Sequence, residues 1–285
     1  MSSAVRTAVL AWSAEGWRDL PWRSTRDPWA VLVSEVMLQQ TQVARVVPRW
    51  QAFLSRWPTP SACAASSPDE VVRAWAGLGY NRRALNLHRC AAVVAERHGG
   101  LLPDDLDALR ALPGVGPYTA RAVLAFAFGH DVGVLDVNAA RVLTRGLAGR
   151  RLAPAELQRL ADSLVPPGQG WRWNQSLLDL GAQVCTAGVP RCERCPIRAD
   201  CAWRAVGGPD PAAPTARQSR FAGSDRQGRG RLRDALRAAA VTSDAVAVAC
   251  GWPGDGERAA RIADGLIADG FAVRDDRGAL SLRRS

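Results

Sequence analysis

The sequence predicts an all-α protein with a small hairpin near its C-terminus. Apolar residues recur at helical spacing, as in Leu106, Leu109 and Leu112, which share one face of a helix. Several expected helices open with proline, and glycines follow where they should end. A strand-turn-strand pattern is expected at 271–282. The chain should therefore consist mainly of helices joined by short turns.

Composition limits the class of protein. The 285 residues allow one or two domains, and 47% hydrophobic content is ample for a core. Basic residues exceed acidic ones by ten, 37 against 27, which favours a polyanionic partner but also fits solubility or a genomic preference for arginine. We find neither a membrane-spanning apolar run nor a signal-peptide pattern after Met1, so we expect a cytoplasmic protein without a membrane partner.

The first elements surround an acidic residue in an apolar helix. An amphipathic helix is expected from Val5 to Trp12, then a break at 20–23 (LPWR), then a helix from Trp29 to Val43. Glu35 lies among the apolar residues of this second helix. A lone glutamate in a helix is usually solvated, whereas a buried one has a raised pKa and can donate a proton near neutral pH. Both interpretations are open at this point.

The segment 77–83 (GLGYNRR) predicts a turn between helices. Helices are expected at 48–57 and 68–76 before it and at 86–98 after it. Leu78 and Tyr80 would stand in this turn beside Arg82. An apolar wedge with cations suits insertion into a nucleic-acid minor groove. A helix–helix corner anchored by a tyrosine explains the same residues equally well.

The segment from Leu112 to Asp136 predicts two helices joined by a tight hairpin. Proline and glycine in 113–116 (PGVG) end the first helix, and Pro117 opens the second. The first turn of the second helix leaves N–H groups unpaired beside a loop that has almost no side chains. Such a site suits a phosphate, although an ordinary helical hairpin has the same residues. Asp136 would cap a further helix at 139–147.

Four of the seven cysteines are clustered, with the spacing C-x6-C-x2-C-x5-C. In a cytosolic protein such a cluster binds metal more often than it forms disulfides. A zinc ribbon normally has two CxxC pairs, and only one is present here. Ligation by four cysteines suits an iron–sulfur cluster. The predicted ligands are Cys185, Cys192, Cys195 and Cys201.

These motifs together resemble the helix-hairpin-helix DNA glycosylases of the endonuclease III superfamily, over roughly residues 4 to 205. The resemblance lies in four features: LPGVG with the following TA, LD-x-N at 135–138, the cysteine spacing, and SEVMLQQTQV at 34–43. The last is similar, nearly letter for letter, to the MutY branch, the adenine glycosylases that act at mismatches. The resemblance implies a base-excision enzyme, a monomer, which binds double-stranded DNA with a mismatch or oxidised base pair and is nucleoid-associated when bound. It also implies a [4Fe-4S] cluster on the four cysteines.

The resemblance also implies roles for individual residues. Glu35 would be the catalytic acid that protonates adenine at N7, and Asp136 would stabilise the cationic sugar. Three residues match base-pocket positions: Arg23, Asn138 and Gln175. The positions matched to DNA contacts are Gln40, Thr41, Leu78, Tyr80, Arg82, Gly114, Val115 and Gly116.

Position 118 separates two subclasses of these enzymes. Bifunctional members carry a lysine here that forms a Schiff base with the sugar, whereas this chain has Tyr118 and no lysine anywhere. We therefore predict a monofunctional glycosylase in which Tyr118 orders the pocket. Tyrosine also occurs here in some mismatch-thymine glycosylases. A thymine or uracil glycosylase acting opposite guanine remains an alternative, as does a catalytically silent iron–sulfur DNA-binding protein.

The resemblance further implies a domain organisation. Residues 1–27 with 131–206 would form a cluster-bearing helical domain, and 28–130 a six-helix barrel. A linker at 207–221 would lead to a small winged-helix-like module at 222–285. This last segment is too short for the larger domain with which long MutY proteins recognise 8-oxoguanine, and it resembles the shortened ends of some actinobacterial adenine glycosylases. Asn81 also departs from the family, which usually has a second tyrosine at this position.

Overall fold

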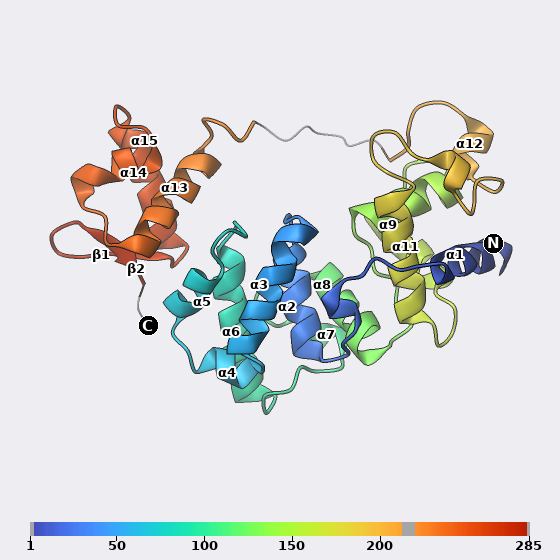
Figure 1. Ribbon diagram of the computed structural model, residues 1–285, viewed down its shortest axis with the longest axis horizontal. Helices are drawn as coiled ribbons and strands as arrows, with labels where there is room; N and C mark the ends of the chain where they lie inside the picture. The colour runs from blue at the N-terminus through green and yellow to red at the C-terminus, as the bar shows by residue number, and fades with distance from the viewer. Residues whose placement is uncertain (1–2, 213–219, 284–285) are drawn as a thin grey trace. The chain divides into compact units, whose positions relative to one another are not determined.

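The computed structural model describes residues 3–212 and 220–283, and these are mostly helical (Figure 1). The chain divides into two compact units. The first contains Met1–Glu35, Leu102–Ala111 and Val115–Ala216, and the second contains Val36–Leu101, Leu112–Gly114 and Arg217–Ser285. Neither unit coincides with a predicted domain, and the domain boundaries stay predictions. Part of the predicted linker, 213–219, lies outside the described residues.

The first unit is built from helices that pack around an apolar core. Its helices are α1 (Ser3–Ala14), η1 (Pro21–Arg23), most of α2 (Pro28–Leu38), α7 (Leu106–Arg110), α8 (Pro117–Val123), η2 (Leu124–Phe128), α9 (Val137–Leu143), η3 (Thr144–Ala148), α10 (Pro154–Leu164), α11 (Gly170–Gln183), η4 (Cys192–Arg194) and α12 (Ala202–Val206). α9 lies beside α11, and α1 packs on α11 as well (Figure 1). Leu143, Leu164, Trp173 and Leu180 are fully buried in this core, which holds α9 and α11 together.

The second unit contains a helical part and a C-terminal module. The helical part has α3 (Val43–Arg56), α4 (Pro60–Ala64), α5 (Pro68–Ala74) and α6 (Arg82–Arg97). The module has α13 (Asp225–Ala238), η5 (Ser243–Ala245), α14 (Val246–Cys250), α15 (Gly256–Ala268) and the strands β1 (Ala272–Arg274) and β2 (Leu280–Leu282). The strands pair antiparallel, with Ala272 opposite Leu282, so the predicted C-terminal hairpin is confirmed.

Several helix boundaries differ from the sequence prediction. α2 ends at Leu38 rather than Val43, because the chain turns at 39–42, where Gln40 has a left-handed φ of 53°. α3 then begins at Val43 and continues through Pro48. The missing N–H of this proline leaves only the carbonyl of Ala44 without its helical bond, so the helix tolerates it. α6 begins at Arg82, four residues before the predicted start at 86.

The glycine hairpin of 113–116 has the predicted position between α7 and α8. Gly114 has a φ of 79°, and a Cβ there would lie 2.7 Å from the Cβ of Asn86, so both its conformation and its space require glycine. Gly116 does not use this freedom, because its φ of −90° is ordinary extended backbone. No helix of 3–212 or 220–283 is long and apolar enough to cross a membrane.

Candidate active site

Glu35 lies near the C-terminal end of α2, and its side chain is buried. The hydroxyl of Tyr118 on α8 donates a hydrogen bond to its carboxyl, while Oε2 has no partner among the described residues. The pKa of Glu35 is raised to about 7, chiefly by burial and also by the nearby charge of Asp136. The Tyr118 bond and the positive charge of Arg23 oppose that rise. A substantial fraction of Glu35 is therefore protonated at neutral pH and can donate its proton.

Asp136 caps α9 and interacts electrostatically with Glu35. Its carboxyl accepts hydrogen bonds from the backbone N–H groups of Asn138 and Ala139 at 2.8 and 2.7 Å, and from the Asn138 side chain at 2.7 Å. Burial raises the pKa of Asp136, and these bonds oppose the rise by stabilising its ionised form. The two carboxyls therefore lie close enough to interact electrostatically but have different surroundings, an arrangement that suits separate acid and anion roles.

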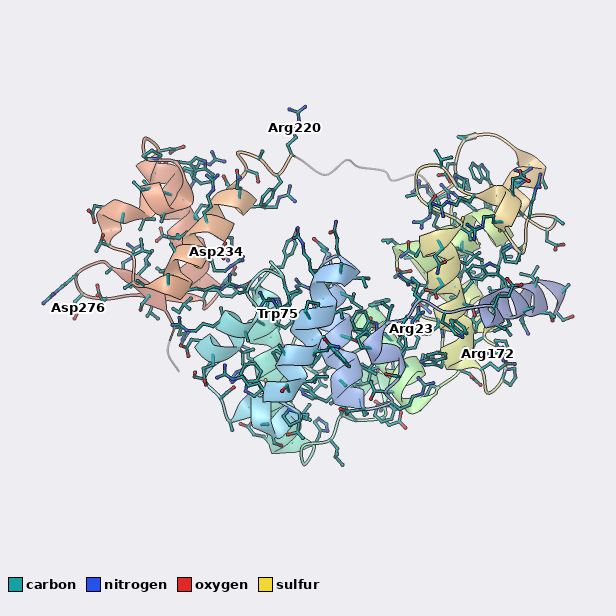
Figure 2. The ribbon with its side chains drawn as sticks, viewed as in Figure 1. Arg23, Trp75, Arg172, Arg220, Asp234 and Asp276 are labelled. Carbon is teal, nitrogen blue, oxygen red and sulfur yellow. The ribbon has the colours of Figure 1, made fainter. Side chains whose placement is uncertain are left out.

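Arg23 is held by a buried aspartate that sequence reasoning missed. Asp179 on α11 accepts hydrogen bonds from Nη1 and Nη2 of Arg23, both at 2.8 Å, and from Nε of Arg18 at 2.5 Å. Burial alone would raise the pKa of Asp179, but the two arginines lower it. The clue was available, since Asp179 is an acid among leucines as Glu35 is an acid among apolar residues. Arg23, labelled in Figure 2, is thereby fixed in the turn before α2.

Arg141 on α9 links the cysteine loop to Asp136. Its Nε donates to the carbonyl of Cys185 at 2.6 Å, and Nη2 donates to Oδ1 of Asn138 at 2.8 Å. Asn138 in turn holds the carboxyl of Asp136. Nη2 also donates to the carbonyl of Gly181 on α11 at 2.7 Å. A continuous series of hydrogen bonds therefore runs from the first predicted cluster ligand to the second carboxyl.

The four clustered cysteines line one hollow of the first unit. Its walls include apolar side chains of Val142, Leu180 and Ile197. Within the described ranges, no three His, Cys, Asp or Glu side chains are grouped closely enough to hold a single metal ion. Four cysteine thiols around one apolar hollow are a donor set that suits an iron–sulfur cluster.

The predicted DNA-contact residues of the second unit come together at two turns. Thr41 donates to the carbonyl of Leu78 at 3.2 Å and accepts from Nη2 of Arg83 at 3.0 Å. Arg83 also donates to the carbonyls of Val36, Met37, Leu78 and Gly79, so it joins the turn after α2 to the loop before α6. Sequence reasoning did not assign this role to it. Tyr80 and Arg82 are exposed, but Leu78 is 4% exposed, so only Tyr80 of the predicted apolar pair is presented at the surface.

The remaining predicted residues lie on separate elements. Gln175 is buried within α11, four residues before Asp179, and its contact with a base stays a prediction. Gly114, Val115 and Gly116 form the hairpin before α8. The first unit brings three side chains close enough to Glu35 to change its pKa: Arg23, Tyr118 and Asp136.

This helical fold, with a buried glutamate close to Asp136 and a glycine hairpin before α8, is that of a base-excision DNA glycosylase. Residues 33–167 match the family described as HhH-GPD superfamily base excision DNA repair protein. A solved thermostable thymine-DNA glycosylase is 31% identical with a TM-score of 0.68, over 71% of this chain and 95% of that one. A non-covalent endonuclease III–DNA complex, 24% identical over 71% of this chain and 97% of that one, shares the fold with a TM-score of 0.62.

Similar proteins of known name indicate which family of DNA glycosylases the chain belongs to. The adenine DNA glycosylase of Mycolicibacterium smegmatis is 44% identical over 96% of this chain and 94% of its own length. The adenine DNA glycosylase of Homo sapiens is 42% identical over 71% of this chain and 40% of its own length. The chain belongs to the adenine DNA glycosylase family of the HhH-GPD superfamily, which confirms the predicted fold and family. This family of DNA-repair enzymes typically carries an iron–sulfur cluster.

Proposed function

We propose that this chain is a monofunctional DNA glycosylase that hydrolyses the N-glycosidic bond of adenine mispaired with 8-oxoguanine or guanine. The observation that carries the proposal is the pair of electrostatically interacting carboxyls, Glu35 and Asp136. Glu35 has a pKa of about 7 and an Oε2 without a partner among the described residues, whereas hydrogen bonds from the start of α9 and from Asn138 stabilise Asp136 as an anion. Family membership supplies the substrate class, DNA.

The two carboxyls perform different parts of the reaction. Glu35 protonates adenine at N7, so the base leaves as a neutral molecule when the bond to C1′ breaks. Asp136 stabilises the positive charge that develops on the sugar. Water then adds to C1′ and releases a proton, which leaves an abasic site. Because neither acid can reach an adenine inside the stack, the nucleotide must first be extruded from the duplex.

The walls of the pocket position these groups. Tyr118 holds Glu35 through its hydroxyl, and the Asp179 carboxylate holds Arg23 against α11. We assign Arg23, Asn138 and Gln175 to the base pocket. Tyr118 also occupies the position of the Schiff-base lysine of bifunctional enzymes, and the chain contains no lysine. Lysine-dependent strand cleavage is therefore not expected.

The DNA-binding surface is proposed to include both turns of the second unit and the glycine hairpin. Gln40 and Thr41 would enter the duplex opposite the extruded base, and Tyr80 with Arg82 would hold the distorted strand. Gly114, Val115 and Gly116 would place backbone N–H groups at a phosphate.

We further propose that the chain acts as a monomer on the bacterial nucleoid in the cytoplasm. The C-terminal module at 222–285 would be winged-helix-like.

We also propose that Cys185, Cys192, Cys195 and Cys201 hold a [4Fe-4S] cluster. The support is the donor set, the shared apolar hollow and the family. When bound, the cluster would supply a rigid centre for the loop at 185–201. Arg191 and Arg194 in that loop would then face DNA phosphates.

Single-turnover base release tests the proposed function. The duplexes carry adenine opposite 8-oxoguanine, adenine opposite guanine, thymine opposite guanine, or uracil opposite guanine. Adenine release is expected from the first two, with strand cleavage only after alkali treatment. Release of only thymine or uracil would establish the alternative substrate, and no release from any duplex would establish a silent DNA-binding protein. Strand cleavage without alkali would contradict the monofunctional assignment.

A further inference from the structure

Arg83, in the first turn of α6, is a buried cation held by neutral oxygen atoms. It is 9% exposed, and all three nitrogens of its guanidinium donate hydrogen bonds. The acceptors are the hydroxyl of Thr41 and five backbone carbonyls, those of Val36, Met37, Leu78, Gly79 and Tyr80. Burial lowers the pKa of Arg83 to about 10, so the side chain stays charged at neutral pH. A buried charge with this many bonds indicates that the geometry around it matters.

The acceptors come from three segments of the second unit. Nη1 donates to the carbonyls of Val36 and Met37 at 2.7 and 2.9 Å, in the last turn of α2, where carbonyls lack a helical partner. Nη2 donates to Thr41, after α2, and to the carbonyls of Leu78 and Gly79, before α6, each at 3.0 Å. One side chain therefore joins the end of α2, the turn that follows it and the loop before α6.

The turn and the loop each contain a left-handed residue that is not glycine. Gln40 has a φ of 53° and Tyr80 a φ of 46°, a conformation that such side chains rarely adopt. Strained backbone of this kind persists where the surrounding bonds hold it. Arg83 supplies bonds at both places. It donates to the hydroxyl of Thr41, which directly follows Gln40. It also donates to the carbonyls of Gly79 and Tyr80, so both peptide groups of Tyr80 are bonded to it.

The two strained residues are also exposed to solvent, whereas the arginine that holds them is buried. Gln40 is exposed, and Tyr80 is 46% exposed. Both belong to the surface proposed above to distort the duplex. Strain that is established when the protein folds does not have to be established when DNA binds, so turns held in this way lower the cost of entering the duplex.

We propose that Arg83 is a positioning residue for base extrusion, which holds both turns so that Gln40 enters the duplex while Tyr80 holds the distorted strand. The inference rests on the proposed function, because extrusion is the step that delivers adenine to Glu35. Being buried, Arg83 acts through the two exposed residues. Without it the turns relax, and a smaller fraction of the bound adenine is extruded.

Single-turnover base release with three variants tests the positioning role. Arg83→Met keeps the length of the side chain but removes its donors, and Arg83→Lys keeps the charge but not the planar fork. Both should slow adenine release opposite 8-oxoguanine about 10- to 100-fold, the factor expected when strained turns are no longer held. Arg97→Met, at an exposed arginine of the same helix, should react as wild type. Wild-type rate constants in both Arg83 variants would overturn the inference.

A fluorescent neighbour of the target base measures extrusion directly. The fluorescence of 2-aminopurine, placed next to the target adenine, rises when that adenine leaves the stack. The measurement uses a Glu35→Gln background, in which the base is not released. At saturating protein, adding Arg83→Met should reduce the rise by the same factor as it reduces the rate of release. An equal rise with and without Arg83→Met would overturn the role in extrusion.

The pH dependence of release shows whether Arg83 acts on the turns or on Glu35. The side chains that shift the pKa of Glu35 are Tyr118, Asp136 and Arg23. Variants of Arg83 should therefore keep the pH profile of wild type while the rate falls at every pH. A shifted alkaline decline would show that Arg83 acts on Glu35 through α2, and would overturn the role in extrusion.

The amplitude of release separates positioning from a purely structural role. If Arg83 served only the fold, its variants would contain less folded protein, which lowers the amplitude and leaves the rate constant unchanged. The expected result is full amplitude with a lower rate constant. Affinity for a fully matched duplex should stay within about twofold of wild type, because phosphate contacts do not require the strained turns. A reduced amplitude at the wild-type rate constant would overturn the inference.

Two further comparisons keep the test decisive. Arg83→Lys retains a cation at the end of α2, so it provides the measurement if Arg83→Met fails to fold. Wild-type protein is measured in parallel on the same duplexes. Absence of adenine release by wild type refutes the proposed function, whereas unchanged rate constants in the variants of an active enzyme refute only the role of Arg83.

Discussion

Glu35 shows at the scale of one residue how catalysis and stability oppose each other. Burial raises its pKa from 4.5 to about 7, which makes it a proton donor near neutral pH. The same burial means that the folded protein binds this proton more tightly than the unfolded chain. Stability is therefore highest below the unfolded pKa and is lost as the pH rises through 4.5 to about 7.

Glu35→Gln should abolish adenine release and stabilise the protein above neutral pH. The amide carries no charge, so the free energy of unfolding at high pH should increase by about 2–3 kcal/mol, with little change below pH 4.5. Urea unfolding at both ends of this range, with single-turnover assays, measures both effects. An equal stability change at both ends would show that ionisation is not its cause, and normal turnover would remove Glu35 from the mechanism.

Tyr118→Phe should shift the pH dependence of the reaction. The hydroxyl lowers the pKa of Glu35, so its loss should raise that pKa and move the alkaline decline in rate to higher pH. Single-turnover pH profiles measure the shift. Tyr80→Phe, at the other tyrosine of the chain, provides the matched control. A shift toward lower pH would contradict the hydrogen bond from Tyr118 to Glu35.

At the scale of elements, the close packing of α9 against α11 positions Asp136. A Cβ at Gly181 would lie 2.7 Å from both the Cβ and the carbonyl oxygen of Asn138, the residue that holds the Asp136 carboxyl. Gly181→Ala should therefore force the two helices apart, at about 1–3 kcal/mol of stability, and slow base release. Thermal unfolding and single-turnover rates measure both. Gly188→Ala, in open space, should be neutral, and equal behaviour of the two variants would contradict this packing role.

The cysteine loop should depend on its cluster. Cys195→Ser should lower the iron and sulfide content and destabilise the first unit, because Cys195 packs against its core. Chemical iron analysis and thermal unfolding report both changes. Cys250→Ser, at a buried cysteine of the C-terminal module, should retain the full iron content. Full iron content in the Cys195 variant would remove that residue from the ligand set.

The whole molecule carries ten more basic than acidic residues, and all the basic ones are arginine. Binding to a duplex should therefore weaken steeply with salt, because each phosphate contact releases counterions and contributes about 0.9 to the slope of log affinity against log salt. Fluorescence anisotropy from low to physiological salt gives this slope. An affinity that stays constant over that range would contradict binding through phosphates.

The sequence predicted those parts of the site that depend on local residue chemistry. Four features can be recognised from their neighbouring residues alone: Glu35 in an apolar helix, Asp136 before a helix, Tyr118 in place of lysine, and the cysteine spacing. The structure confirms the helical class and brings the first three together. Helix ends were less predictable, because Pro48 lies inside α3 and the turn at Gln40 is left-handed.

Only the tertiary structure revealed how distant residues hold the site in place. Arg23 and Asp179 are separated by 156 positions in the sequence. Arg141 donates a hydrogen bond to the carbonyl of Cys185, which lies 44 positions away. No local pattern records such pairs, because they form only when the packed helices bring the two side chains within hydrogen-bond distance. Sequence thus determined the chemistry of this protein, and folding determined which residues support it.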